Sequence, residues 1–138
     1  MNKRNYISLA NKAANIQINE LKKVKKIFNS SFIEAVDLIL NCKGKVIFAG
    51  IGKSGLIARK ISATFSSVGI PSFFCDPAQA LHGDMGQIEK KDILIIFSYS
   101  GNTAELNNML KYANRFRIRI IGIASKPDSI LLKASDIK

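Results

Sequence analysis

Apolar residues recur every three or four positions through the first forty residues of the chain. From residue 7 to residue 28 they keep steps of three, four or seven, which places them on one stripe of a long helix: Ile7, Ala10, Ala14, Leu21, Val24 and Phe28. Ser31 and Glu34 have the spacing of a capping box, which predicts a second helix that ends within residues 41–44. We therefore expect two helices before the first strand, and the stripe of the first helix needs a surface to pack against.

From residue 45 onward the pattern changes to short, continuous apolar runs that alternate with helical spacing. The runs predict strands over 45–49, 71–75, 93–97 and 118–124, with helices over 54–68, 103–116 and 128–134. Continuous apolar strands that alternate with helices are typical of a parallel sheet covered on both faces. The predicted fold is therefore a three-layer α/β sandwich with a mostly parallel sheet, and its ligands should bind beyond the carboxyl ends of the strands.

The composition is that of one folded domain. With 138 residues, 47% hydrophobic and 22% charged, the chain can bury a core but has no room for a second full domain. The apolar run at 93–97 is far too short to span a bilayer, and no apolar signal segment follows the basic residues 1–4, so we expect a cytoplasmic protein. Cys42 and Cys75 are too few for a disulfide framework and are expected to be reduced thiols.

The net charge of +11 raises the question of nucleic acid binding. Basic residues are dense at only one place, in the first helix: Lys22, Lys23, Lys25 and Lys26. No aromatic residues interleave with them as a base-stacking surface would require, so this cluster is interpreted as a solvated helix face. We expect neither a nucleic acid nor a membrane as partner, and an attraction for small anionic ligands such as sugar phosphates.

A glycine-rich loop follows the first predicted strand. Gly50, Gly52 and Gly55 have the spacing of the dinucleotide fingerprint, and Asp76 near the end of the second strand could bind a ribose, so a dinucleotide-binding domain is one alternative. A nucleotide P-loop is excluded because Ile47 stands where its first glycine is required. Lys53 lies inside this sharply turning loop, which makes it a candidate electrophile or phosphate contact.

A hydroxyl-rich loop follows the third predicted strand. Ser98, Ser100 and Thr103 surround a glycine just before a helix, where three hydroxyls and the free amides of a helix N-terminus could bind a phosphate. The alternative is an ordinary capped turn, although one cap needs only one hydroxyl. Glu105 falls in the first helical turn and is a candidate base, or a carboxylate that merely complements the helix dipole.

The single histidine lies in the segment 81–86. Glycines on its carboxyl side allow unusual backbone angles, and Asp84 could orient the ring of His82. A solvent-facing loop histidine is the alternative. A metal site is not assigned, because no other histidine or cysteine stands near it in the sequence.

These residues resemble the sugar isomerase (SIS) domain and, within it, the arabinose-5-phosphate isomerases. The resemblance covers the chain from about residue 34 to its end and is carried by residues 50–55, 63–74, 82–86 and 98–101. It implies that the hydroxyl loop binds the sugar phosphate and that Lys53 and Glu105 take part in catalysis, with His82 available for ring opening or orientation. It also implies a substrate site that includes Ser54, Gly69, Ile70 and Asp76. Members of the family often have a histidine linked to zinc binding where this chain has Asp76.

The activity implied by the resemblance is the interconversion of D-arabinose 5-phosphate and D-ribulose 5-phosphate through a cis-enediol, without a redox cofactor. The product would feed synthesis of Kdo, the eight-carbon acid sugar of lipopolysaccharide. A homotetramer is implied as well. The alternative is a non-catalytic, sugar-phosphate-binding regulatory module, which would normally carry a helix-turn-helix that residues 1–44 do not show.

The resemblance also bears on the extent of the domain. The family continues with a fifth strand, which should begin at residues 135–138, and with helices that supply another catalytic glutamate and a histidine, usually followed by paired CBS modules. We therefore expect residues 1–138 to form the amino-terminal part of one SIS-like domain, without CBS modules, and to bind sugar phosphate with weakened affinity and little isomerisation.

Overall fold

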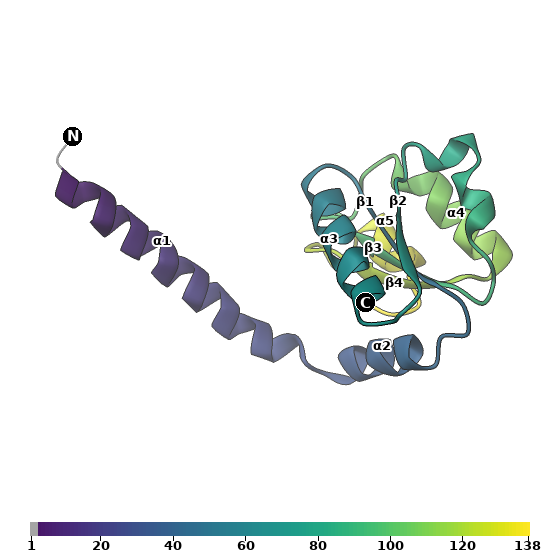
Figure 1. Cartoon of the computed structure of the whole chain (residues 1–138), viewed down its shortest axis with the longest axis horizontal. Coiled ribbons are helices and arrows are strands. Elements are labelled where there is room, and N and C mark those ends of the chain that lie inside the picture. The colour runs from purple at the N-terminus through teal and green to yellow at the C-terminus, as the bar shows by residue number, and fades with distance from the viewer. Residues whose placement is uncertain (1–2) are drawn as a thin grey trace. The chain divides into compact units, whose positions relative to one another are not determined.

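The computed structural model describes residues 3–138 as three helical segments followed by a four-stranded sheet with its own helices (Figure 1). The elements are α1 (Lys3–Val24), η1 (Lys25–Ile27), α2 (Ser30–Leu40), β1 (Val46–Gly50), α3 (Lys53–Ser67), β2 (Ser72–Cys75), η2 (Ala80–His82), η3 (Asp84–Gln87), β3 (Ile93–Phe97), α4 (Leu106–Phe116), β4 (Arg119–Ile123) and α5 (Ile130–Ala134). The chain divides into two compact units, residues 1–34 and residues 35–138. None of the helices within residues 3–138 is both long and apolar enough to cross a membrane.

The first unit consists of α1, η1 and the start of α2. The long helix predicted from the apolar stripe is confirmed as α1, which η1 continues. The capping residue of α2 was predicted wrongly as Ser31: the Asn29 side chain accepts the hydrogen bond from the N–H of Phe32, at 3.3 Å. Asparagine is as good a cap as serine, and the Asn29 carbonyl also accepts the N–H of Ile33, so the helix begins two residues earlier than predicted.

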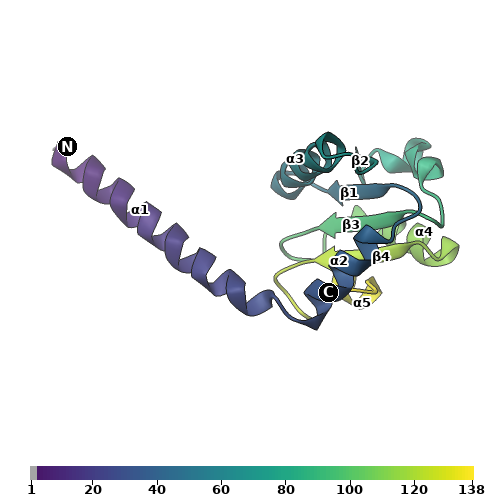
Figure 2. The same cartoon turned by 60° about the horizontal axis from the view of Figure 1, so that its bottom comes forward.

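The second unit is built on four parallel strands, as the sequence predicted, and the structure gives their order as β2-β1-β3-β4 (Figure 2). Strand boundaries differ from the predicted ones by at most one residue at each end. The larger difference is α4, which begins at Leu106 instead of Thr103. The Thr103 hydroxyl is 2.9 Å from that of Ser98, and its carbonyl accepts the N–H of Leu106 in a tight turn, so residues 103–105 belong to the loop.

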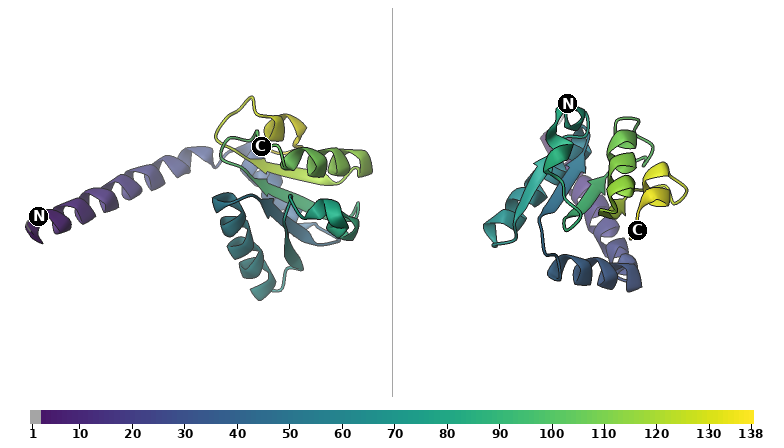
Figure 3. Two further views of the ribbon diagram at one scale, coloured as in Figure 1. Left: turned by 90° about the horizontal axis from the view of Figure 1, so that it is seen from above. Right: turned by 90° about the vertical axis from the view of Figure 1, so that its right-hand side faces the viewer.

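Helices cover both faces of the sheet, which makes the three layers that the sequence predicted (Figure 3). Successive residues of a strand point to opposite faces of the sheet and so contribute to two cores. Ile47, Leu94 and Ile96 pack with α4 and α5 on one face. Phe48 and Ile95 pack on the other face with α3 and the second half of α2. Because β1 is completely buried, both of its faces must be apolar, which explains its continuous run of apolar residues.

The ends of two elements agree with the sequence analysis. Gly69 terminates α3 as expected: its N–H bonds to the carbonyl of Ser66, and the N–H of Ile70 bonds to that of Phe65. Near the end of the chain, Ile137 forms a parallel bridge with Ile121 of β4. Residues 135–138, where the resemblance implies the start of a fifth strand, thus already pair with the edge of the sheet.

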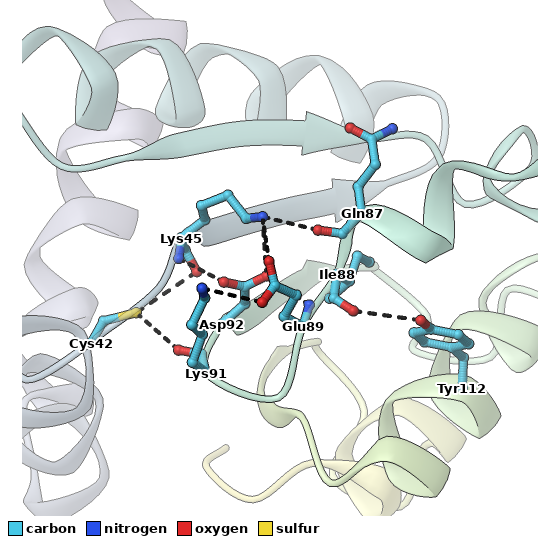
Figure 4. Close-up of polar contacts among 8 residues, drawn as sticks. All are labelled: Cys42, Lys45, Gln87, Ile88, Glu89, Lys91, Asp92 and Tyr112. Atoms are coloured by element: carbon cyan, nitrogen blue, oxygen red, sulfur yellow. Dashed lines mark hydrogen bonds and ion pairs between the residues drawn. The ribbon is translucent and has the colours of Figure 1, made fainter.

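A buried carboxylate joins the beginnings of β1 and β3 (Figure 4). The Asp92 side chain is fully buried and accepts the N–H groups of Lys45 and Glu89, each at 2.8 Å. The Lys45 ammonium lies 3.6 Å from the same carboxylate and donates to the carbonyl of Gln87 at 3.0 Å. This cluster, which we call the Asp92 clip, holds together the two strands whose opposite ends carry the candidate site.

Candidate sugar-phosphate site

The carboxyl ends of β1 and β3 open into a single pocket. Gly50, the last residue of β1, pairs with Phe97, the last residue of β3, so the loops that follow these strands are neighbours. Between them lies an open pocket of about 320 Å³ lined by Ile51, Lys53, Ser54, Phe97, Ser98, Tyr99, Ser100 and Thr103. The predicted adjacency of the two loops is therefore confirmed. In a parallel sheet of this strand order, successive strands are added toward one edge up to β2 and toward the other edge from β3 onward. Ligands bind at the point between β1 and β3 where this order reverses.

Hydrogen bonds within the loop 98–103 set the directions of its hydroxyl groups. Ser98 is buried; its Oγ accepts the N–H of Gly101 at 3.0 Å and lies 2.9 Å from the Oγ1 of Thr103. The Ser100 Oγ accepts the N–H of Asn102 at 3.2 Å. A hydroxyl has one proton to donate, so the Ser100 proton and one of the two protons shared by Ser98 and Thr103 remain available to an anion in the pocket.

The segment after β4 holds this loop in place from outside. The N–H and the hydroxyl of Ser125 both donate to the carbonyl of Tyr99, at 3.0 and 2.6 Å. The Asn102 side chain accepts the N–H of Ile130 at 2.9 Å, and the Gly101 carbonyl accepts that of Leu131 at 2.9 Å. The loop is therefore organised before any ligand arrives, which lowers the entropic cost of binding.

The electrostatics of the pocket suit an anion. Lys53 is the first residue of α3 and is exposed, and no carboxylate within residues 3–138 lies close enough to form an ion pair with it. The amino ends of α3 and α4 flank the two loops, and helix amino ends carry free N–H groups and a positive partial charge. A phosphate group in this pocket would meet an ammonium, hydroxyl donors and two helix dipoles.

Glu105 and Asp76 lie near this edge of the sheet but do not line the pocket. Glu105 is exposed at the N-cap position of α4, two residues after Thr103, and its side chain forms no capping bond. Asp76 follows β2; one carboxylate oxygen accepts the N–H of Ala78, and the other is 3.9 Å from the guanidinium of Arg59. The Asp76 carboxylate is thus already partnered by a cation of this chain.

The remaining residues implied by the resemblance, His82, Gly69 and Ile70, do not line the pocket either. His82 is exposed at the end of η2 and is followed by Gly83. Gly69 and Ile70 precede β2, whose first residue pairs with Val46 at the start of β1. They therefore lie at the amino edge of the sheet, opposite the pocket, and the single chain does not bring them to the hydroxyl loop.

Two further groups bear on the chemistry. Burial raises the pKa of the Cys75 thiol to about 11, with the charges of Asp84 and Asp76 adding to the shift. This thiol is therefore neutral at physiological pH and is a poor nucleophile, although it directly precedes Asp76. No group of three or more His, Cys, Asp or Glu side chains within residues 3–138 is arranged to hold a metal ion.

The sequence analysis missed several residues of the pocket. Ile51, Phe97 and Tyr99 line it beside the residues that were singled out, and Ser125 fixes the loop from the end of β4. Ile51 and Tyr99 could have been found from their positions inside the two loops, and Phe97 from its position at the end of β3. Ser125 had no such signal, because its contact with Tyr99 joins residues 26 positions apart that only the fold brings together.

Comparisons with known proteins agree with this geometry. The model of the SIS domain family matches residues 39–138. The arabinose 5-phosphate isomerase GutQ of Escherichia coli K12 is 40% identical over 116 residues, which are 84% of this chain and 36% of that protein. The chain spans about two fifths of the length of the curated relatives it matches.

Two solved structures have the same fold over nearly the whole chain. A protein of Escherichia coli CFT073 in complex with arabinose 5-phosphate is 38% identical, with a TM-score of 0.85 over 99% of this chain and 73% of that one. A Listeria monocytogenes protein, provisionally assigned as a sugar-phosphate isomerase, is 31% identical, with a TM-score of 0.95 over 100% of this chain and 73% of that one. These matches favour the sugar-phosphate interpretation of the glycine loop over the dinucleotide alternative.

Proposed function

Because the chain belongs to the SIS domain family, we propose that it binds a sugar phosphate in the pocket between β1 and β3 and serves the interconversion of D-arabinose 5-phosphate and D-ribulose 5-phosphate. The observation that carries the proposal is the meeting of Lys53 with the Ser98–Thr103 loop in one pocket at the carboxyl edge of the sheet. The complex formed by the relative at 38% identity supports arabinose 5-phosphate as the ligand to test first.

The roles proposed for the residues follow the needs of the reaction. Isomerisation moves a proton between C2 and C1 through a cis-enediol, so it needs a base and a cation near the developing oxyanion. Lys53 supplies the charge, Glu105 is the candidate base, and His82 opens the sugar ring or orients the substrate. The phosphate is held remotely by the loop hydroxyls, so that its binding energy positions the reacting carbons. No redox cofactor takes part in this scheme.

The substrate-binding set of the proposal comprises Ser54, Gly69, Ile70, Asp76, Ser98, Ser100 and Thr103. Ser54, Ser98, Ser100 and Thr103 are supported by their place on the pocket. Gly69, Ile70 and Asp76 rest on the resemblance alone. The supply of the product to Kdo and lipopolysaccharide synthesis is the biological context that the proposal implies.

Phosphate binding by the loop hydroxyls is tested by calorimetric titration of the chain with arabinose 5-phosphate and with arabinose. The phosphate ester should bind and the free sugar should not, because the pocket offers its donors to an anion. Ser100→Ala should weaken binding about tenfold, since it removes a hydrogen bond to a charged group. Ser67→Ala is the matched control, because the Ser67 hydroxyl bonds only to Thr64 of its own helix. Equal affinity for both sugars, or equal effects of both substitutions, would contradict the proposed site.

The catalytic role of Lys53 is tested by turnover, measured on the chain extended to the length of the curated relatives, because residues 1–138 alone are expected to show little isomerisation. Lys53→Ala should lower kcat at least about a hundredfold, which corresponds to about 2.7 kcal/mol of transition-state stabilisation. Lys60→Ala, a lysine of the same helix whose ammonium bonds to Thr64, should leave kcat unchanged. Tight binding without any turnover in the extended chain would instead identify a non-catalytic regulatory module.

A further inference from the structure

Tyr99, like Ile51 and Phe97, lines the pocket without a role in the proposed mechanism. It stands between Ser98 and Ser100, lines the pocket and is 82% exposed, more than any other large hydrophobic side chain in the described part of the chain. An exposed aromatic ring beside a polar pocket is available for contact with a ligand.

The exposure of this ring does not come from a loose loop. The Tyr99 carbonyl accepts two hydrogen bonds from Ser125, and the N–H of Ser98 continues the sheet by bonding to the carbonyl of Ile123 at 3.0 Å. The backbone therefore fixes the direction in which the side chain leaves the loop. Within residues 3–138 the ring has no aromatic or cationic partner, and its hydroxyl has no hydrogen bond. Only the side-chain torsions remain free.

Most of the other lining residues suit the phosphate group of a ligand, and few suit its sugar. The hydroxyls, Lys53 and the helix amino ends are donors and charges suited to a phosphate group. The C–H groups of the sugar carbons, in contrast, can pack against an apolar or aromatic surface. Ile51 and Phe97 can offer little of it because both are partly buried, and Phe97 already stacks on Phe48. The Tyr99 ring is the exposed apolar surface of the lining.

We propose that Tyr99 is a specificity-determining residue whose ring packs on the carbon chain of the bound sugar phosphate and excludes water from the mouth of the pocket. This inference rests on the proposed function of the pocket. In this arrangement the loop hydroxyls select for the phosphate group, and Tyr99 selects for the sugar to which the phosphate is attached. Sugar phosphates are thereby distinguished from inorganic phosphate at one residue.

The test compares two ligands on matched variants by calorimetry. Tyr99→Ala should weaken arabinose 5-phosphate binding at least about tenfold, equivalent to about 1.4 kcal/mol, and change inorganic phosphate binding less than about twofold. Tyr99→Phe should retain the affinity of the original chain, because the proposed contact is made by the ring. Tyr6→Ala, which removes an exposed tyrosine from α1, is the control and should change neither affinity.

Tyrosine fluorescence gives a second readout that does not depend on activity. The chain has three tyrosines and no tryptophan, so its intrinsic emission comes from Tyr6, Tyr99 and Tyr112. Arabinose 5-phosphate should change the emission of the original chain and of Tyr6→Ala, and should leave that of Tyr99→Ala unchanged.

Each other outcome overturns the inference in an identifiable way. If Tyr99→Ala keeps the affinity for arabinose 5-phosphate, the inference fails while the proposed function stands. If Tyr99→Ala loses both ligands to the same degree, Tyr99 acts on the loop and not on the sugar, and the specificity role is wrong. If the original chain binds neither ligand, the proposed phosphate pocket fails and the inference fails with it.

Discussion

At the scale of single residues, the pocket depends on side chains that the loop 98–103 holds in fixed directions. Ser98 is buried and its hydroxyl is used inside the loop, whereas Ser100 keeps a proton for a ligand. The two serines of the motif thus differ: the Ser98 hydroxyl accepts the N–H of Gly101 and shares a proton with Thr103, whereas the Ser100 proton is not used within the loop. The motif alone does not distinguish them, because the difference lies in which hydroxyl faces the core.

Gly101 has no room for a side chain in this loop. Its φ is +66°, and a Cβ atom there would overlap the side chain of Ser129. Gly101→Ala should therefore lower the free energy of unfolding by about 1–3 kcal/mol and weaken sugar-phosphate binding. Thermal unfolding followed by circular dichroism measures the first effect. Gly86→Ala is the control, because open space surrounds Gly86, and it should change the stability by less than about 0.5 kcal/mol. Equal losses in the two variants would contradict this account of the loop.

At the scale of elements, two strands carry the site at one end and are joined at the other. The Asp92 clip sets the beginnings of β1 and β3 side by side, and their register brings Gly50 and Phe97 together at the pocket. The pocket loops continue directly from these paired strands. No clip residue lines the pocket.

Asp92→Asn tests the importance of the clip. Each carboxylate oxygen accepts a backbone N–H group. In the asparagine variant an NH₂ group replaces one oxygen, so two donors face each other at a fully buried position. The free energy of unfolding should fall by about 1–3 kcal/mol, as measured by urea denaturation. Glu89→Gln is the matched control: its carboxylate forms only exposed ion pairs with Lys45 and Lys91, so its loss should cost under about 1 kcal/mol. A stable Asp92→Asn protein would show that the buried charge is not needed for pairing.

At the scale of the whole molecule, the apolar stripe of α1 is not covered by the rest of the first unit. Within the described residues 3–34 no second element packs along α1, and Ile7 and Leu21 of its stripe are 68% and 70% exposed. Exposed apolar stripes of this length are typical of helices that pack against a partner. Together with the family resemblance, this supports the proposal of a homo-oligomer, with a tetramer as the expected state.

Light scattering at micromolar concentration tests that proposal. The chain should have the mass of an oligomer, and the double substitution Ile7→Lys with Leu21→Lys should reduce it, because charge on the stripe opposes burial. Asn15→Lys with Asn19→Lys adds the same charge to the polar side of α1 and should leave the mass unchanged. A monomer in the unaltered chain would contradict the prediction. The expectations of a cytoplasmic location and of a single SIS-like domain stay predictions.

Sequence patterns were enough to predict the layers of the sheet, the four strands and the two loops that carry the site. These follow from local causes: apolar runs, helical spacing, and glycine and serine at the strand ends. The patterns did not determine which residues meet. The Asp92 clip, the bond from Ser125 to Tyr99 and the separation of Gly69 from the pocket all join or divide residues far apart in the chain. Only the tertiary structure decides such relations, because strand order and register set them, whereas sequence patterns report the surroundings of each residue one at a time.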